Sequence, residues 1–230
     1  MKTGLLIIAT GKYDRFLPSL IESANTHFSP TEEVEYFVFT NHSDLNIQSH
    51  RKIHTLHIEH EPWPNPTLKR YDYFLSHRSA LETTNHLFYC DADMRFMSAV
   101  GSEILGDRVG TIHPGFHNKP RHTWSYERRQ SSCAYVPSNE GAYYFAGGFV
   151  GGSTEEFLSM SSTISRWRQT DANNGIVPVW HDESLLNKYY ILHQPTVVLN
   201  PSYCHPERWK ANYEVKLLAL DKNHKEVRTP

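Results

Sequence analysis

The sequence predicts an α/β fold in which helices flank a mainly parallel central sheet. Through the first 110 residues, short apolar runs alternate with segments of helical periodicity, which is typical of β-α-β units. One of these runs ends in two aspartates, at the kind of strand end where parallel sheets bind ligands. The chain has 230 residues and no repeat or long linker, so one fused unit is expected.

Each expected strand is a short run of apolar residues rich in β-branched or aromatic side chains. These runs are 5–10, 35–40, 86–92, 109–113, 142–152 and 196–201. A further segment carries His54, His57 and His60 among alternating apolar residues. That alternation favours a surface strand over a metal site.

Two early helices are expected from apolar residues at helical spacing. The first lies within 16–28, where Leu17, Leu20 and Ile21 share a face, and the second within 70–86, with Tyr71 and Phe74 on one stripe. Both stripes are interpreted as core and not as cofactor contacts. Residues 60–67 contain three prolines and are expected to form a loop.

Composition excludes several classes of partner. The formal charge is −2 and no dense basic stripe is present, so neither nucleic acid nor an anionic membrane is expected to bind. Cys90, Cys133 and Cys204 show no zinc-ligand spacing and favour a reducing compartment. The N-terminal apolar run 5–9 is too short for a signal sequence or a membrane span, so a cytoplasmic location is expected.

The segment "HLFYCDADMRF" contains the first candidate site. In an extended strand Asp91 and Asp93 would point to the same side, with Ala92 pointing away. Two carboxylates in one small space can hold a hard cation such as Mg²⁺ or Mn²⁺. The alternative is an ordinary solvated strand end.

The segment "VPVWHDESLLNKYY" contains the second candidate. Trp180, His181, Asp182 and Glu183 open an expected helix. Asp182 could simply cap that helix, whereas an aromatic residue beside carboxylates also suits sugar binding.

The third candidate is a glycine-broken aromatic run, "AYYFAGGFVGGS". Glycines at 147, 148, 151 and 152 indicate a bulge or a close approach of the backbone to a neighbour. The segment is not a dinucleotide-binding fingerprint, because no G-x-G-x-x-G opens a helix here.

Taken together, these motifs resemble glycosyltransferase family 6, the family of the histo-blood-group A and B transferases and the α-1,3-galactosyltransferase. The resemblance spans nearly the whole chain. Its motifs, in order, are "HFSP", "DADM", "EILGDRVGTIHPGF", "SYERRQSSCAYVP", "EGAYYFAGGFVGG", "WHDESLLNKYY", "PTVVLNPSYC" and "KNHKEVRTP". The chain resembles most the soluble bacterial and phage members.

The resemblance implies a GT-A fold, a UDP-sugar donor and transfer with retention of the α configuration onto O3 of a β-galactoside, with or without fucose. It also implies Mn²⁺, with Mg²⁺ as the alternative, held by Asp91 and Asp93. As one catalytic domain, 1–110 would bind the nucleotide sugar and 111–220 would bind the acceptor and catalyse. Residues 221–230 would form a flexible tail.

By motif, the resemblance assigns a role to each candidate residue. Glu183 would be the nucleophile or would stabilise the oxocarbenium face. Besides the metal pair, the donor-binding residues would be Tyr13 on uracil, Arg70 on the donor sugar, Ala92 on ribose, Gly147, Gly148, Asp182 on sugar hydroxyls, and Lys222 and Arg228 on the diphosphate. The acceptor-binding residues would be His113, Ser125, Trp180 and His181.

Two positions bear on substrate choice. Gly115 and Gly148 match the positions at which the N-acetylgalactosamine enzyme has glycine, so UDP-N-acetylgalactosamine is the expected donor and UDP-galactose the alternative. His205 and Pro206 replace a Trp-Asp pair of the family, so one acceptor-binding carboxylate is missing.

Two readings from other classes remain. A metal-dependent phosphohydrolase would use Asp91 and Asp93, but the sequence supplies neither a phosphate loop nor a second set of metal ligands. A carbohydrate-binding module would explain the aromatic and glycine content but not the acidic pair.

Overall fold

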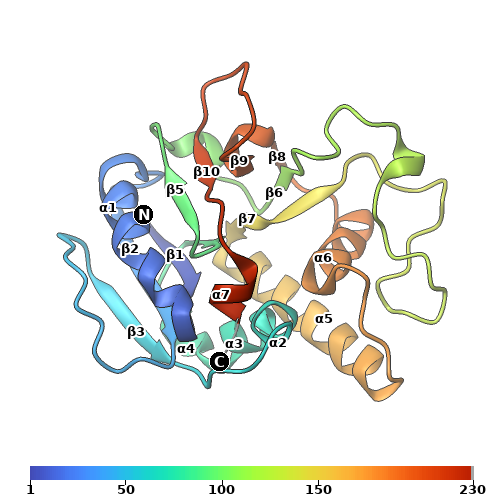
Figure 1. Ribbon diagram of the computed structural model, residues 1–230, viewed down its shortest axis with the longest axis horizontal. Coiled ribbons are helices and arrows are strands. Elements are labelled where there is room, and N and C mark those ends of the chain that lie inside the picture. The colour runs from blue at the N-terminus through green and yellow to red at the C-terminus, as the bar shows by residue number, and fades with distance from the viewer. Residues whose placement is uncertain (229–230) are drawn as a thin grey trace.

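The computed structural model describes residues 1–228, apart from the side chain of residue 228, and contains a seven-stranded sheet with helices on both faces (Figure 1). Its strands are β1 (Lys2–Ile8), β2 (Glu33–Thr40), β3 (Ile53–His57), β4 (His86–Cys90), β6 (Arg108–Ile112), β7 (Phe145–Ser153) and β8 (Val197–Leu199). They lie in the order β3-β2-β1-β4-β7-β6-β8. The predicted α/β fold is confirmed.

Most of this sheet is parallel. β3, β2, β1 and β4 run in the same direction, as do β6 and β8, while β7 runs antiparallel to both β4 and β6. β3 is the edge strand that the histidine-containing segment predicted. Because β7 is antiparallel to β4, the beginning of β7 lies beside the end of β4. The candidate site lies at this edge of the sheet.

A second, three-stranded sheet is built from very short strands. β5 (Met94–Phe96) pairs antiparallel with β10 (Leu217–Ala219), and β10 pairs parallel with β9 (His205–Pro206). None of these strands was predicted, since two or three residues are too few to show periodicity. β5 begins directly after the two aspartates, so this sheet adjoins the candidate metal site.

The early helices follow the predicted stripes with one change. α1 (Leu17–His27) buries Leu17, Leu20, Ile21 and Ala24 as expected, and Pro18 occupies its first turn. The second expected helix is divided at His77 into α3 (Arg70–Ser76) and α4 (Arg78–Leu81). The expected loop 60–67 runs into a four-residue helix, α2 (Asn65–Leu68).

The later helices include one that the sequence pattern did not reveal. α5 (Thr154–Asn173) follows β7 directly, and its many serine and threonine residues hide its buried face. α6 (His181–Leu192) begins where the second candidate segment predicted a helix, and α7 (His224–Arg228) lies in the tail. Single 3-10 turns are η1 (Gly11–Phe16), η2 (Ser102–Ile104), η3 (Arg121–Thr123) and η4 (Pro201–Cys204).

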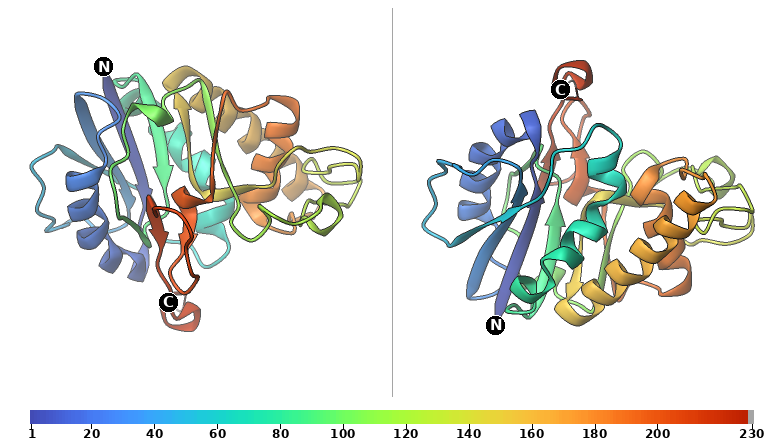
Figure 2. Two further views of the ribbon diagram at one scale, coloured as in Figure 1. Left: turned by 90° about the horizontal axis from the view of Figure 1, so that it is seen from above. Right: turned by 90° about the horizontal axis from the view of Figure 1, so that it is seen from below.

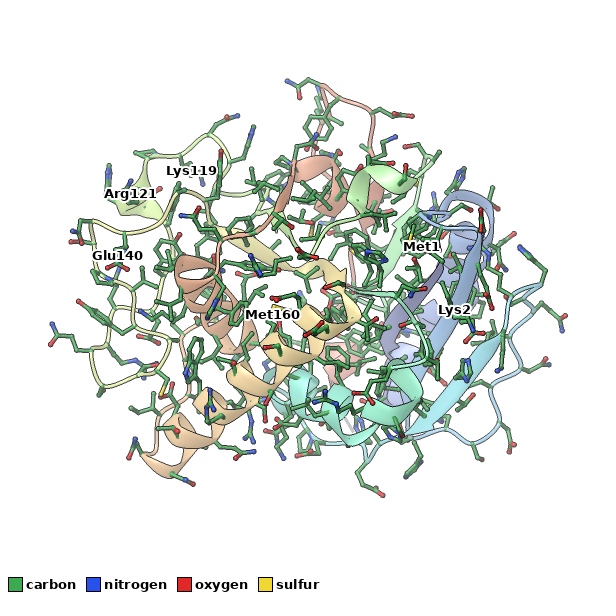
Figure 3. The ribbon with its side chains drawn as sticks, turned by 180° about the vertical axis from the view of Figure 1, so that it is seen from behind. Met1, Lys2, Lys119, Arg121, Glu140 and Met160 are labelled. Atoms are coloured by element: carbon green, nitrogen blue, oxygen red, sulfur yellow. The ribbon has the colours of Figure 1, made fainter. Side chains whose placement is uncertain are left out.

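Two apolar layers hold these elements together. On one face of the large sheet, Leu5 and Ile7 of β1 pack with α1 and with residues of the small sheet. On the other face, Leu6 and Ile8 pack with α3, α5 and α6. Alternate residues of one strand therefore serve opposite layers. Figure 2 shows α1 and α5 on opposite sides of the sheet, and Figure 3 shows α5, with Met160, crossing the rear face.

Candidate active site

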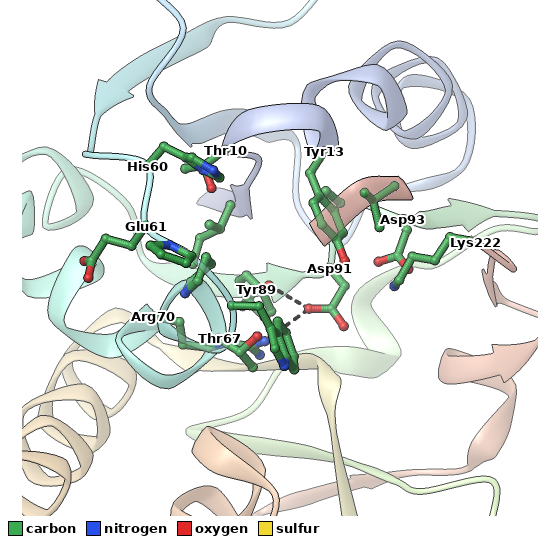
Figure 4. A pocket seen from close by; sticks show the side chains of 16 residues that line it. Thr10, Tyr13, His60, Glu61, Thr67, Arg70, Tyr89, Asp91, Asp93 and Lys222 are labelled. Carbon is green, nitrogen blue, oxygen red and sulfur yellow. Dashed lines mark hydrogen bonds and ion pairs between the residues drawn. The ribbon is translucent and has the colours of Figure 1, made fainter. Parts of the chain in front are cut away.

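The two predicted metal ligands lie in a turn and not in a strand. β4 ends at Cys90, and the N–H of Met94 donates to the carbonyl of Asp91 at 3.2 Å. The predicted strand 86–92 was therefore too long, and the alternation argument for Asp91 and Asp93 was wrong. Both side chains nevertheless line one cavity at the carboxyl edge of the sheet (Figure 4), so the predicted shared space is confirmed.

Asp91 is oriented by two donors on one of its oxygens. The Tyr89 hydroxyl donates to Oδ1 at 2.6 Å, and Arg70 Nη2 donates to the same atom at 3.2 Å, as the dashed lines in Figure 4 show. Burial raises the pKa of Tyr89 well above its usual value, so this hydroxyl stays protonated and remains a donor. The carboxylate is thereby fixed with its second oxygen available to the cavity.

Asp93 is held by the tail. Its Oδ2 forms an ion pair with Lys222 Nζ, and that ammonium group also lies 5.5 Å from the centre of the Tyr13 ring. The tail residue expected over a diphosphate therefore reaches the acidic turn. Arg228 ends α7, but its side chain lies outside the described residues, so its contact with the diphosphate stays a prediction.

Apolar and charged side chains both line this cavity, and charged groups lie on both sides of it (Figure 4). Its lining comprises Ile8, Thr10, Tyr13, His60, Glu61, Pro62, Trp63, Pro66, Thr67, Arg70, Tyr89, Asp91, Ala92, Asp93, Lys222 and Val227. Tyr13, Ala92, Arg70 and the acidic pair meet here, as predicted. A ligand with both a partly apolar ring and charged groups would match this lining.

A second chamber adjoins the first and shares four of its residues. The shared residues are Trp63, Thr67, Arg70 and Asp91, and the rest of the lining is Gly147, Gly148, Trp180, His181, Asp182, Glu183 and His224. The glycine pair and the "WHDE" segment, more than 30 positions apart in the sequence, thus face each other. This is the juxtaposition that the sequence motifs predicted.

Arg70 is the buried residue that joins the two chambers. In addition to Asp91, its Nη1 donates to the carbonyl of Gly147 at 2.6 Å and lies 3.2 Å from Asp182 Oδ2. Only 4% of Arg70 is exposed, so its charge is compensated almost entirely by protein groups.

Two buried polar atoms of the Arg70–Asp182 pair have no hydrogen-bond partner within the described residues. They are Arg70 Nε and Asp182 Oδ2. Burial raises the pKa of Asp182 to about 6, although Arg70 acts in the opposite direction. Asp182 Oδ2 nevertheless remains within ion-pair distance of Arg70 Nη1, so the carboxylate balances the buried guanidinium charge.

Glu183 is held at both carboxylate oxygens. Oε1 accepts from the Tyr144 hydroxyl and Oε2 from the N–H of Gly147, each at 2.9 Å. Burial raises the pKa of Glu183 to about 7, and these two donors oppose that shift. The carboxylate is thus presented to the second chamber in a fixed orientation.

Asn187 locks Glu183 to β7. Its Nδ2 donates to the carbonyls of Glu183 and Phe145, each at 2.9 Å, and its Oδ1 accepts from the N–H of Phe145 at 2.8 Å. Helix α6 and the glycine pair are therefore tied together by one side chain, which is fully buried.

The predicted close approach at the glycine pair is confirmed. A Cβ atom at Gly147 would lie 3.2 Å from Asp182 Oδ2, and one at Gly148 would lie 3.1 Å from Asp91 Oδ2. A side chain at either position would crowd a carboxylate of the site.

His181 has a left-handed backbone, with φ of 51°. This conformation is uncommon for a residue with a side chain and is found most often at functional sites. It turns the chain into α6, and the His181 ring meets Trp63 edge-on at 5.3 Å. Trp180 beside it is 52% exposed.

Of the remaining predicted acceptor residues, His113 contacts Tyr144, and Ser125 directly precedes Tyr126, whose ring lies 5.3 Å from that of Tyr144. The His113 ring lies 5.7 Å from that of Tyr144, the residue that donates to Glu183. Burial lowers the pKa of His113 to about 4, with Lys119 acting in the same direction, so this imidazole is neutral at pH 7. Neither residue lines the two chambers in the described part of the chain, and the acceptor role of Ser125 stays a prediction.

Several site residues were not identified from the sequence. Tyr89 precedes the acidic turn by two positions, Tyr144 lies in the aromatic run before the glycines, and Trp63 comes from the proline-rich loop. Tyr144 and Trp63 act through contacts between distant segments, which no local pattern reveals, whereas Tyr89 contacts Asp91 only two positions away. The proline-rich segment around Trp63 was expected only to be a loop.

The acidic turn fits a divalent cation whose remaining ligands would come from a bound substrate. Among the described residues no three His, Cys, Asp or Glu side chains gather as a metal site. Asp91 and Asp93 would therefore supply two carboxylates and a bound diphosphate the other oxygens, which is the usual way that proteins bind Mg²⁺ with phosphates. Within residues 1–228, no helix has the length and apolar character to span a bilayer.

The fold and site together define the class of the protein. A mainly parallel sheet flanked by helices, with an acidic turn at its carboxyl edge, is the architecture of a GT-A glycosyltransferase. The family model described as glycosyltransferase family 6 matches residues 1–229. The chain belongs to this family, and it is an enzyme of the hexosyltransferase type.

Relatives from animals and bacteria align over nearly the whole chain. A globoside alpha-1,3-N-acetylgalactosaminyltransferase 1 from Gallus gallus is 36% identical over 98% of this chain and 68% of its own length. A histo-blood group ABO system transferase 1 from Rattus norvegicus is 38% identical with the same coverage. An O-antigen biosynthesis glycosyltransferase, WbnI, from Escherichia coli is 28% identical over 96% of this chain and 95% of its own length.

Proposed function

We propose that this enzyme transfers N-acetylgalactosamine, or galactose as the alternative, from a UDP-sugar to O3 of a β-galactoside in α-1,3 linkage, with a divalent metal ion. The observation that carries the proposal is the position of Glu183. Its carboxylate faces the glycine-lined chamber, and that chamber opens into the cavity of the acidic turn through Arg70. The activity named for the chicken relative, a globoside alpha-1,3-N-acetylgalactosaminyltransferase, agrees with this reaction.

The donor would lie across both chambers. Uracil would stack on Tyr13, ribose would contact Ala92, and the diphosphate would lie between the acidic turn and Lys222. Mn²⁺, or Mg²⁺ in its place, would be held by Asp91 and Asp93 and would neutralise the leaving diphosphate. The donor sugar would then occupy the second chamber, beside Arg70 and Asp182.

The identity of the sugar is inferred from the backbone at Gly148. Gly148 lines the second chamber, and any Cβ atom there would crowd Asp91. The bare backbone supports a donor with a bulky acetamido group at C2, so UDP-N-acetylgalactosamine is the preferred donor. Gly115 lies beside His113 and lines neither chamber among the described residues, so it supports the choice less directly.

Glu183 would act on the anomeric carbon from the side opposite the diphosphate. As a nucleophile it would form a glycosyl ester while the bond to the UDP oxygen breaks, and O3 of the acceptor would then displace the carboxylate. Alternatively, it would stabilise the positive charge of the oxocarbenium while the acceptor attacks from the side of the leaving group. Both routes retain the α configuration, and in both the proton of the acceptor hydroxyl can pass to the departing phosphate.

The acceptor would approach from the side of Trp180, His181 and His113. An exposed indole beside a polar ring suits the mixed apolar and hydroxylated surface of a sugar. All three cysteines are free thiols, which agrees with the cytoplasmic location that forms part of this proposal.

The test is a panel of UDP-sugars and β-galactosides, incubated with the enzyme and Mn²⁺ or with a chelator. We expect a product whose NMR spectrum shows an α-linked sugar on O3 of galactose, and no product with the chelator. Transfer with inversion, or full activity in the chelator, would contradict the corresponding part of the proposal.

A further inference from the structure

The loop between β9 and β10, residues 207–216, is anchored by a buried histidine. His205 is 3% exposed, and its Nε2 lies 3.0 Å from the carbonyl of Trp209. A carbonyl only accepts, so Nε2 carries the proton, and in the neutral ring Nδ1 accepts from the Tyr213 hydroxyl at 2.9 Å. The residue that replaces a family tryptophan thus holds this loop at Trp209 and at Tyr213.

The base of the same loop is fixed by further contacts. The N–H of Glu207 donates to the carbonyl of Ala219 at 2.9 Å, and Glu207 Oε2 accepts from the N–H of Asp221 at 2.8 Å. Arg208 forms an ion pair with Asp221. These contacts hold the loop, drawn in red at the top of Figure 1, in one conformation, so its side chains point in fixed directions.

That conformation leaves a large aromatic side chain in solvent. Trp209 is 53% exposed, although an indole is among the most favourable groups to bury. A Cβ atom at Gly115 would lie 3.0 Å from the His113 ring and 3.9 Å from Trp209 Cη2. The indole and the His113 imidazole therefore approach each other across Gly115.

This position connects the indole to the reacting carboxylate. His113 contacts Tyr144, and the Tyr144 hydroxyl donates to Glu183. Trp209 consequently lies beyond His113, on the same path that leads from Glu183 to the predicted acceptor residues.

We propose that Trp209 is a specificity-determining residue of the acceptor site, with its indole packed against the apolar face of the acceptor galactoside beside His113. This inference rests on the proposed function and deepens it. Galactose has one face of C–H groups, because its axial hydroxyl points to the other face, and such a face pairs with an aromatic ring. Pro206 stands at the position of the family's acceptor-binding carboxylate, and the indole of Trp209 supplies an acceptor contact in its place.

The experiment compares the wild type with Trp209→Ala and Trp209→Phe. Leu192→Ala is the matched control, because Leu192 is 54% exposed and lies at the end of α6. At saturating UDP-sugar, Trp209→Ala should raise the acceptor KM by on the order of 10-fold and leave kcat within about 3-fold, as expected for lost ground-state binding. Trp209→Phe should recover most of the loss, and Leu192→Ala should show none.

A second readout does not depend on turnover. Saturation-transfer NMR with methyl β-galactoside should show strong transfer to the ring protons in the wild type and in Leu192→Ala, and a large loss in Trp209→Ala. Melting temperatures of all variants check that the loop change has not unfolded the enzyme.

The outcomes separate this inference from the proposed function. An unchanged KM and an unchanged NMR signal in Trp209→Ala, with normal transfer by the wild type, would overturn the inference alone. Galactoside binding that depends on Trp209, without any transfer from the UDP-sugars tested, would overturn the proposed reaction and leave the aromatic contact established. No galactoside binding by the wild type would overturn both.

Discussion

Arg70 Nη1 lies 3.2 Å from Asp182 Oδ2, and both side chains are almost completely buried. The same guanidinium reaches Asp91 and the carbonyl of Gly147, so one cation connects the acidic turn, the glycine pair and α6. This ion pair lies where, in the proposed reaction, the donor phosphate and the donor sugar would meet.

Removal of Arg70 should therefore destabilise the whole protein. Arg70→Met leaves Asp182 buried without a counter-charge, and we expect a loss of ~3–5 kcal/mol in the free energy of unfolding. Urea denaturation at pH 8 measures the loss. The double variant Arg70→Met with Asp182→Asn should recover part of it, and a double variant as unstable as the sum of the single ones would contradict the pairing.

Glu183→Gln should separate binding from turnover. The carboxylate is needed where positive charge develops, so kcat should fall by about 10²–10³ or more, while the Kd for UDP stays within a few-fold. Calorimetry and rate measurements test the two quantities. A variant that loses UDP affinity and keeps its kcat would show that Glu183 belongs to the nucleotide site.

The raised pKa of Glu183 also predicts how stability depends on pH. Its pKa is about 7 in the folded protein, above the ordinary value of 4.5, so the folded state keeps a proton that the unfolded chain releases between these values. The free energy of unfolding of the wild type should then fall, relative to Glu183→Gln, as the pH rises from 5 to 8, by ~1–3 kcal/mol. An equal difference between the two proteins at pH 5 and pH 8 would refute the shift.

Asp91→Asn and Asp93→Asn should remove metal-supported transfer and keep the fold. Both residues lie in a turn at the rim of a cavity and not within either apolar layer. Mn²⁺ titration in the presence of UDP, followed by electron paramagnetic resonance, should show weakened binding in each variant. The control is Asp107→Asn, because Asp107 lies just before β6, at the edge of the sheet away from the acidic turn. Full transfer by either test variant in excess chelator would reject the metal role.

The tail should contribute more to donor binding than to stability. Its described contacts include the Lys222–Asp93 pair, an ion pair of Glu226 with Arg15 at 2.6 Å, buried Val227, and the contacts of Asp221 with Glu207 and Arg208. Removing residues 221–230 should cost no more than ~2 kcal/mol of stability but weaken UDP-sugar affinity and slow transfer. Normal kinetics after truncation would contradict a role of the tail in donor binding. The predicted flexibility extends to residues 229 and 230, which lie outside the described residues.

Gly148→Ala should shift donor choice towards galactose. The added methyl group would lie 3.1 Å from Asp91 Oδ2 and 3.3 Å from Cys204 Sγ, so the chamber narrows at the glycine pair. The ratio of kcat/KM for UDP-N-acetylgalactosamine to that for UDP-galactose should fall ~10-fold or more. Gly101→Ala, in a surface loop, controls for the loss of a glycine. Two results would contradict the proposal that Gly148 makes room for the acetamido group. One is a tenfold preference of the wild type for UDP-galactose, and the other is an unchanged donor ratio in Gly148→Ala.

The sequence predicted the parts of the fold that have strong local periodicity. Apolar runs alternate with helical segments in the first half of the chain, and α1 has an apolar stripe. These signals were sufficient to predict the elements, because burial of one face imposes a regular spacing of apolar residues. α5 escaped prediction because small polar residues such as Ser161 and Ser165 occupy buried positions on it. The small sheet escaped because its strands are defined by their partners and not by their own sequences.

The residues of the candidate site also divide into those with a local sequence signal and those without one. Asp91, Asp93, Asp182 and Glu183 were predicted because carboxylates at strand and helix ends are chemically conspicuous. The hydroxyl of Tyr144 and the clamp by Asn187 were not predicted, since each depends on the distance between segments some 40 residues apart. Motifs therefore identified the candidate groups, whereas only the fold reveals what orients them.

The pairing of β5 with β10 has a consequence for inhibitor design. β5 follows the acidic turn, while β10 follows the loop of Trp209 and precedes the tail, and the N–H of Leu220 donates to the carbonyl of Asp93 at 2.9 Å. One short ladder thus connects the proposed diphosphate site to the proposed galactoside site and keeps them in a constant spatial relation. A single rigid molecule that joins a diphosphate mimic to a galactoside would meet both ends without an induced rearrangement of either.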